Sequence, residues 1–274
     1  MKAWVGVTDW SWYQFLSAQH GIEEVNFWQP GGSRAFSTLE PGEIFLFKLR
    51  RPHDVIAGGG FFAHSALLPL SLAWESFKTG NGAESLAKMK SLIDRYRSKQ
   101  GIVDPNYTIG CIVLVQPFFL PESQWIPAPR DWKPNIVQGK SYDLTQEPGL
   151  SIFNQVKSAL RAPSAEPSWP ALVRDLPDDP RERYGQPVLV RPRLGQGAFR
   201  VLVTDAYDRK CAITSEKVLP VLEAAHIRPY GEQGPHQVDN GILLRSDLHI
   251  LFDRGYVTVT PDLRVEVSRR IHDE

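Results

Sequence analysis

Prolines recur from Arg161 to Pro187 and divide the chain into two parts. Proline lacks a backbone N–H and restricts the residue before it, so this stretch is a poor continuous helix or strand. We expect a semi-stiff linker over 161–187, joining a domain at 1–160 to another at 188–274. A chain of 274 residues is long enough for two domains. The prolines are Pro163, Pro167, Pro170, Pro177, Pro180 and Pro187.

The bulk composition excludes a disordered chain and gives no direct sign of a nucleic-acid binder. Hydrophobic residues make up 42%, and 31 basic residues balance 31 acidic ones. The only cysteines are Cys111 and Cys211, so we expect no disulfide framework and a reducing, cytoplasmic setting. The N-terminus has no signal-like apolar run, and no stretch reaches the ~20 apolar residues that a membrane helix needs.

The first 150 residues mix strand and helix patterns without regular alternation. Strands are expected at 3–7, 43–49, 55–56 and 109–115, with a break at Gly58–Gly60. Helices are expected at 71–77 and 83–97, and in the second Leu86, Met89, Ile93 and Tyr96 share one face. This order indicates an α+β domain on a curved or barrel-type sheet.

The C-terminal part has a strand, a polar loop and a short helix in succession. A helix is expected at 197–207, a strand at 218–227 and a polar loop at 231–241. A short helix at 243–255 and a strand pair at 256–260 and 264–268 follow.

Three polar residues stand at fixed places in that succession. His226 ends the strand, Asn240 lies in the loop 14 residues later (240 − 226), and His249 lies on the helix after 9 more (249 − 240). With Pro229, Gly241 and Asp253 also in place, the stretch from Val188 to Val267 resembles the HNH endonuclease family. The resemblance implies a ββα-metal fold that hydrolyses phosphodiester bonds in double-stranded DNA and leaves 5′-phosphate ends.

The residue types agree with that chemistry. Histidine has the side-chain pKa nearest neutrality, so we expect His226 to be the general base. His249 and Asp253, at i and i+4, are expected to hold a divalent metal, Mg²⁺ or Mn²⁺. Asn240 is expected to hold the loop and to count among the catalytic residues, as the resemblance implies.

The sequence departs from many relatives at two points. Ala225 stands where they place a further ligand, so we expect Glu223, on the same side of the strand, to complete the metal site. Cys211 and Thr214 occupy the spacing of a zinc knuckle, and two cysteines cannot make a four-thiolate site, so no structural zinc is expected.

Basic residues around this segment are expected to contact the DNA backbone, although a solvated charged face would look the same. The DNA-binding candidates are Arg191, Arg193, Arg200, Arg228 and Arg245, with Arg209 and Lys210 nearby.

In the N-terminal part a Pro-Gly-Glu turn stands before a buried strand, and a strand with three glycines follows. This arrangement resembles the PUA superfamily, in particular its EVE and ASCH branches. It implies a pocket in which aromatic rings hold a flipped, modified base, whereas the alternative is that these rings form the core. The pocket candidates are Trp10, Trp12, Trp28, Phe61, Phe62, Trp74, Asn26, Ser33 and His64.

Together the two parts indicate a modification-dependent restriction endonuclease for antiviral defence, acting as a homodimer to cut both strands. Two alternatives stay open. One is a nuclease gated by a small-molecule or nucleotide signal. The other is a non-cleaving nucleic-acid-binding module, for which Ala225 is the best support.

Overall fold

The computed structural model describes residues 1–97, 106–161, 195–228 and 238–272. The chain splits into two compact units, Met1–Arg193 and Leu194–Glu274. Nearly all of the expected linker at 161–187 lies outside the described residues.

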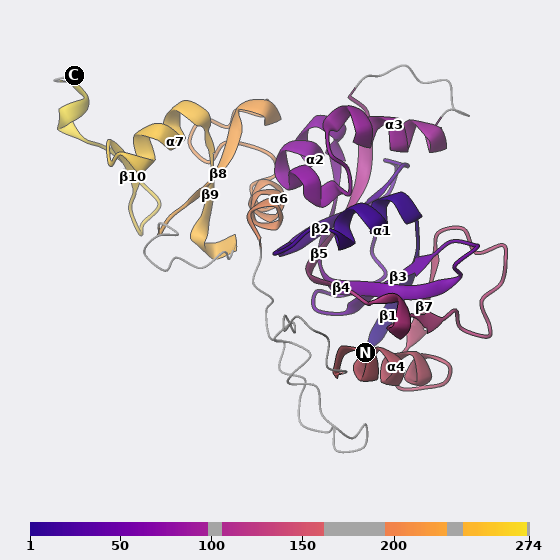
Figure 1. The fold of residues 1–274 in the computed structure, drawn as a ribbon. Coiled ribbons are helices and arrows are strands. Elements are labelled where there is room, and N and C mark those ends of the chain that lie inside the picture. Colours follow the sequence, from indigo (N-terminus) through magenta and orange to yellow (C-terminus); the bar gives the residue numbers. More distant parts are fainter. Residues whose placement is uncertain (98–105, 162–194, 229–237, 273–274) are drawn as a thin grey trace. The chain divides into compact units, whose positions relative to one another are not determined.

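The N-terminal unit is built on one sheet (Figure 1). Its strand order is β2-β5-β4-β3-β1-β7, and β6 pairs with β4 off this path. The pair β1–β3 is parallel and the other pairs are antiparallel. The expectation of an α+β unit is confirmed, but the described strands form an open path and not a closed barrel. The strands are β1 (Lys2–Thr8), β2 (Glu24–Gln29), β3 (Ile44–Leu49), β4 (Val55–Pro69), β5 (Thr108–Phe119), β6 (Ile126–Pro127) and β7 (Gly139–Asp143).

Four α-helices belong to the described part of this unit: α1 (Trp10–Ser17), α2 (Leu70–Phe77), α3 (Leu86–Arg97) and α4 (Gly149–Arg161). A 3₁₀ turn, η1 (Lys78–Asn81), follows α2. Both expected helices are present, the second starting at residue 86. α1 was not predicted, although its buried residues Trp12, Tyr13 and Leu16 have helical spacing, because the helix is only 8 residues long.

The expected break at Gly58–Gly60 is wrong, because these glycines lie inside β4. A Cβ at Gly59 would stand 2.6 Å from the Phe45 carbonyl oxygen and 2.8 Å from the Phe118 ring. The glycines therefore let the neighbouring strands approach closely, and the register shifts between Gly59 and Phe61. The strand is 15 residues long.

A buried polar network joins β2 to η1. The Asn26 amide nitrogen donates to Asn81 Oδ1 (2.9 Å) and to Cys111 Sγ (3.3 Å). The Trp28 indole N–H donates to the Asn81 carbonyl oxygen (3.0 Å). Burial raises the pKa of the Cys111 thiol to about 12, so the thiol stays protonated and unreactive at neutral pH.

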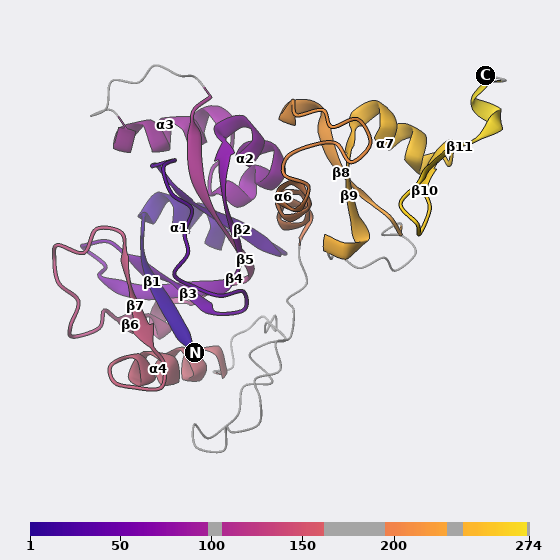
Figure 2. The same ribbon diagram turned by 180° about the vertical axis from the view of Figure 1, so that it is seen from behind.

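The C-terminal unit places a two-stranded ribbon between two helices. Figures 1 and 2 both show β8 (Leu222–His226) and β9 (Gly241–Arg245) between α6 (Gln196–Ala206) and α7 (Ser246–Asp253). A hairpin of β10 (Val257–Val259) and β11 (Val265–Val267) follows. β8 and α7 lie within the expected strand and helix, but β9 was expected as the end of the loop and the start of the helix, which begins only at Ser246. The buried core of the C-terminal unit consists of Phe199, Val203, Cys211, Leu222, Ala225, Ile242, Leu243 and Leu244.

None of the described helices is both long and apolar enough to span a bilayer.

Gly82 is predicted to be required for the packing of Trp12. Its φ of 74° favours glycine, and an added Cβ would overlap the Trp12 ring. Gly21 is a matched control, since its φ is 69° but an added Cβ meets nothing within 4 Å. Gly21→Ala should lower the free energy of unfolding by about 1–2 kcal/mol through backbone strain alone.

Gly82→Ala should cost about 1–3 kcal/mol more, because the Trp12 ring must also shift. Urea unfolding of the full chain, followed by tryptophan fluorescence, measures both variants. Equal losses in the two variants would contradict the packing of Trp12 against Gly82.

Candidate active site

The ribbon β8–β9 sets the faces on which the site residues lie. The strands are antiparallel, and His226 is paired with Gly241 at the open end. Side chains alternate along a strand, so Glu223 and Ala225 share one face and Ala224 and His226 share the other.

The ring of His226 is held flat against Phe199 of α6. The two ring centroids are 4.1 Å apart and the planes differ by 6°. Gly241 makes this approach possible, because a Cβ there would overlap Val203 and stand 3.0 Å from the Phe199 ring. The helix, the imidazole and the first residue of β9 are therefore packed as one group.

Asn240 ties together the two ends of the loop between the strands. Its Oδ1 accepts a hydrogen bond from the Arg228 backbone N–H (2.9 Å), and its Nδ2 donates to the Arg228 carbonyl oxygen (3.2 Å). The Ile227 N–H also donates to the Asn240 carbonyl oxygen (2.8 Å). Asn240 is buried, so these bonds fix the chain directly after His226.

His249 of α7 lies between two carboxylates. Its Nδ1 is 2.6 Å from Glu223 Oε2 on β8, and its Nε2 is 3.3 Å from Asp253 Oδ2 on its own helix. When the Nδ1 of His249 carries a proton, that N–H donates to Glu223, and Nε2 is the ring nitrogen that faces Asp253.

The side chains of Glu223, His249 and Asp253 do not converge on one point. In the described part of the chain, no three His, Cys, Asp or Glu side chains are grouped to hold a metal ion. The geometric reason is that Nδ1 and Nε2 face different sides of the imidazole. Glu223, expected as a ligand of the metal, thus stands where it orients the ring of His249, while Asp253 stands at the nitrogen that can bind an ion.

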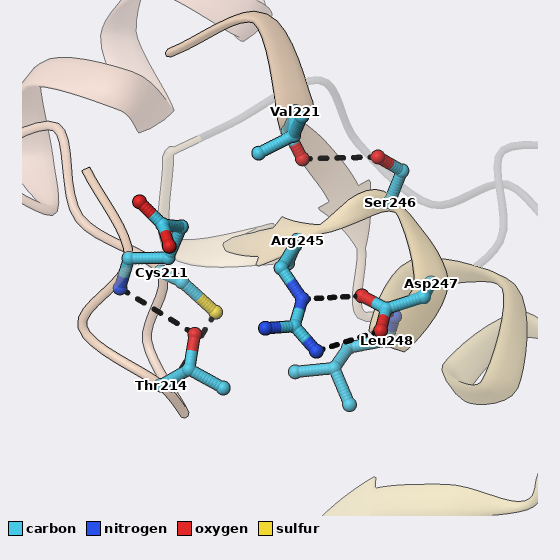
Figure 3. Close-up of polar contacts among 8 residues, drawn as sticks. Cys211, Thr214, Val221, Arg245, Ser246, Asp247 and Leu248 are labelled. Atoms are coloured by element: carbon cyan, nitrogen blue, oxygen red, sulfur yellow. Dashed lines mark hydrogen bonds and ion pairs between the residues drawn. The ribbon is translucent and has the colours of Figure 1, made fainter. Parts of the chain in front are cut away.

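The corner from β9 into α7 is held by polar contacts (Figure 3). Arg245 donates two hydrogen bonds to Asp247, both 2.7 Å long. This ion pair lowers the pKa of the Asp247 carboxyl to about 2. The Ser246 hydroxyl donates to the Val221 carbonyl oxygen (3.0 Å), which ties the start of α7 to the chain before β8.

Cys211 begins a turn that packs against β9. Its thiol is buried and free, and it accepts a hydrogen bond from the Thr214 N–H (3.5 Å). The Ala212 N–H donates to the Leu243 carbonyl oxygen (2.8 Å). Burial raises the pKa of this thiol, but hydrogen bonds from Thr214 and the neighbouring backbone outweigh burial and lower it.

The expected DNA-binding arginines differ in exposure and in their partners. Arg191 and Arg193 lie outside the described residues. Arg200 is half-buried on α6, and Arg228 is exposed directly after Ile227. The two bonds from Arg245 to Asp247 occupy part of its guanidinium, which leaves it fewer donors for phosphate.

The expected base-pocket residues fall into two groups. Trp12, Trp28, Phe61, Phe62 and Asn26 are buried in the N-terminal unit. Trp12 packs edge-on against Phe27 (5.4 Å) and Phe47 (5.1 Å). The remaining residues reach the surface wholly or partly: Trp10, Ser33, His64 and Trp74.

The packing roles of two residues in the C-terminal site were not identified from the sequence. Phe199 was not singled out, and Gly241 was named only as part of the pattern that resembles the HNH family. The signal for Gly241 was a glycine directly before a buried apolar run, which indicates close approach of another segment.

Comparison with known proteins supports the assignment of this unit. Residues 211–260 match the family model HNH_2, described as HNH endonuclease. The C-terminal unit therefore carries an HNH endonuclease segment that contains His226, Asn240, His249 and Asp253. No curated protein matches the chain.

Solved structures match the chain weakly. One of them, a crystal structure of a mutant ASCH protein from Zymomonas mobilis, has 11% sequence identity and a TM-score of 0.36, and the match covers 56% of this chain and 97% of that chain. Likeness at this level does not define a shared fold.

Asn240→Ala is predicted to loosen the loop that follows His226. The change leaves the Arg228 N–H and carbonyl oxygen without this partner, at a cost of about 1–3 kcal/mol in the free energy of unfolding. Hydrogen exchange at the amide of Arg228 should become faster. Asp239→Ala, an exposed change in the same turn, should stay within about 0.5 kcal/mol of the wild type. Unchanged exchange in Asn240→Ala would contradict the role of the amide.

Proposed function

We propose that the C-terminal unit is a divalent-metal-dependent endonuclease that hydrolyses phosphodiester bonds in DNA. The observation that carries this proposal is the His249 imidazole between Glu223 and Asp253, inside the segment that matches the HNH endonuclease model. His226 ends the adjoining strand, and Asn240 fixes the loop that follows.

The pair of His249 and Asp253 fits a divalent cation. Two adjacent ligands of an octahedral ion at about 2.1 Å stand about 3 Å apart. The separation of 3.3 Å between His249 Nε2 and Asp253 Oδ2 is close to that value. Mg²⁺ commonly takes only one or two protein ligands, with water and substrate phosphate completing its shell, so a pair is sufficient. When bound, the ion supplies positive charge that offsets the charge on the phosphate.

Glu223 acts as a positioning residue in this proposal. Its carboxylate accepts the Nδ1 proton of His249 and so keeps the Nε2 lone pair directed at the metal side. Because Glu223 lies on β8 and His249 on α7, the same bond also fixes the helix against the strand.

His226 is the proposed general base. Its imidazole takes the proton from a water molecule as that water attacks phosphorus. The stack on Phe199 limits rotation of the ring, and the Asn240 bonds hold the chain that follows it. Both contacts lower the cost of placing the base during the reaction.

The proposal extends to the N-terminal unit, which would read a modified base in foreign DNA. Its support is the PUA-like order of a Pro-Gly-Glu turn, strand β3 and the glycine-rich strand β4. A reader joined to a nuclease gives modification-dependent restriction. Cutting both strands requires two active sites, which a homodimer supplies.

A non-cleaving nucleic-acid-binding unit is the second candidate. Ala225 is completely buried, so the position directly before His226 offers neither a ligand nor room for one. The metal would then depend on His249 and Asp253 alone, and a lower affinity for the ion would follow.

Cleavage of matched DNA substrates tests the proposal. Unmodified, methylated, hydroxymethylated and glucosylated duplexes are incubated with Mg²⁺ or Mn²⁺, and the products are separated on gels. We expect selective cleavage of one modified duplex, abolished by chelation of the metal. His226→Ala should lower the rate about 10²- to 10⁴-fold, which is the usual contribution of a general base.

His20→Ala is the matched control, because it removes an exposed histidine from the N-terminal unit and should cleave like the wild type. Equal cleavage of all duplexes would retain the nuclease and exclude the modified-base reader. If the wild type cuts no substrate with either metal, the non-cleaving candidate replaces the nuclease.

A further inference from the structure

The most exposed aromatic side chains of the N-terminal unit are gathered in one place. Among the described residues of this unit, the large aromatics classed as exposed are Trp10 (37%) and Tyr96 (41%). Both adjoin Asp9: Trp10 follows it in the chain, and the Tyr96 hydroxyl donates a hydrogen bond to Asp9 Oδ2 (2.6 Å). These residues come from distant parts of the sequence, so the fold brings them together.

Trp10 belongs to an aromatic platform that also contains His53 and Trp125. The rings of Trp10 and His53 are stacked, with centroids 4.5 Å apart and planes 26° apart. Trp125 stands edge-on to both, at 6.2 Å from Trp10 and 5.6 Å from His53. His53 and Trp125 are half-buried, so the platform is partly open to solvent.

Contacts of Tyr13 and Trp125 hold the platform in place. The Tyr13 ring is buried and stacks against Trp10 (5.8 Å). Its hydroxyl lies 3.1 Å from the carbonyl oxygens of both Ala57 and Leu120. The Trp125 indole N–H donates to the Leu120 carbonyl oxygen (3.0 Å). Little side-chain entropy therefore remains to be lost when a ligand binds there.

Arginines stand beside the platform. Arg50 forms an ion pair with Asp9 (3.0 Å), keeps 47% of its side chain exposed and lies over the Tyr96 ring (5.3 Å). Arg51 is exposed next to it, and the charge of Arg95 acts on Tyr96. Carboxylates lie near the same residues: Asp9 pairs with Arg50, and the charge of Glu122 acts on Tyr13. Arg51 and Arg95 add positive charge beside this ion pair.

We propose that the platform of Trp10, His53 and Trp125 stacks against an unpaired or extruded nucleobase, while Arg50 and Arg51 contact the neighbouring phosphates. The inference rests on the proposed function and names the surface through which the N-terminal unit binds DNA. Trp12, Trp28, Phe61 and Phe62 are occupied in packing the core.

The chemistry of the surface favours nucleic acid as its occupant. Every base offers a π-face to an aromatic ring, and stacking of one base contributes about 1–3 kcal/mol. Guanidinium groups attract phosphate independently of sequence. An exposed tryptophan beside several arginines combines these two modes of binding.

Binding of unmodified DNA tests the platform separately from cleavage. The chain carries His226→Ala so that DNA is not cut, and fluorescence anisotropy measures Kd for a fully paired duplex and for the same duplex with one unpaired base. The unpaired base should tighten binding. Trp10→Ala should raise the Kd for the duplex with the unpaired base about 5- to 100-fold. His53→Ala should act in the same direction.

Two controls isolate the stacking. Trp10→Phe keeps a ring and should retain most of the gain from the unpaired base. Leu86→Ala removes a side chain of equal exposure, 37%, from the far end of α3 and should leave Kd unchanged. If Trp10→Ala fails to fold, as judged by circular dichroism, His53→Ala decides the result.

Equal gains from the unpaired base in the wild type, Trp10→Ala and His53→Ala would overturn the proposal. Since no cleavage and no base modification enters the measurement, its failure is distinguishable from a failure of the nuclease or of modification reading.

Discussion

The C-terminal unit depends on an imidazole held from two sides. With Glu223 at Nδ1 and Asp253 at Nε2, His249 cannot rotate without losing both contacts, which are 2.6 and 3.3 Å long. One contact crosses from α7 to β8, and the other stays within α7. The same array therefore fixes the helix on the ribbon and directs one nitrogen toward a carboxylate. A divalent cation placed between that nitrogen and that carboxylate meets ligands that are already oriented.

Small residues allow the two helices to approach the ribbon from either side. Gly241 leaves room for Phe199 and Val203 of α6, and Ala225 is fully buried in the core. The close approach of α6 is what brings the Phe199 ring against His226. Packing and chemistry are thus coupled in this unit, because a side chain that displaced α6 would also release the proposed base.

The sequence predicts the C-terminal site better than the N-terminal one, for a physical reason. The residues of the HNH segment lie within about 30 positions of each other in a strand, loop and helix, so local patterns suffice to place them. The platform of Trp10, His53 and Trp125 is assembled by strand pairing between distant segments, which a single sequence does not reveal. Burial of aromatics such as Trp12 depends on the same long-range contacts. The contact of Glu223 with His249 Nδ1 could not be predicted, because period-two alternation gives the face of a strand and not the atom that a side chain meets.

Binding of Mn²⁺ tests most directly whether the array is a metal site. The signal of free Mn²⁺ in electron paramagnetic resonance falls as the ion binds, which gives both stoichiometry and affinity. We expect one ion per chain, lost in His249→Ala and Asp253→Ala and retained in His226→Ala. Glu223→Gln should weaken binding about 10- to 100-fold, as loss of an orienting carboxylate does elsewhere. Unchanged binding in His249→Ala and Asp253→Ala would show that these two side chains do not hold the ion.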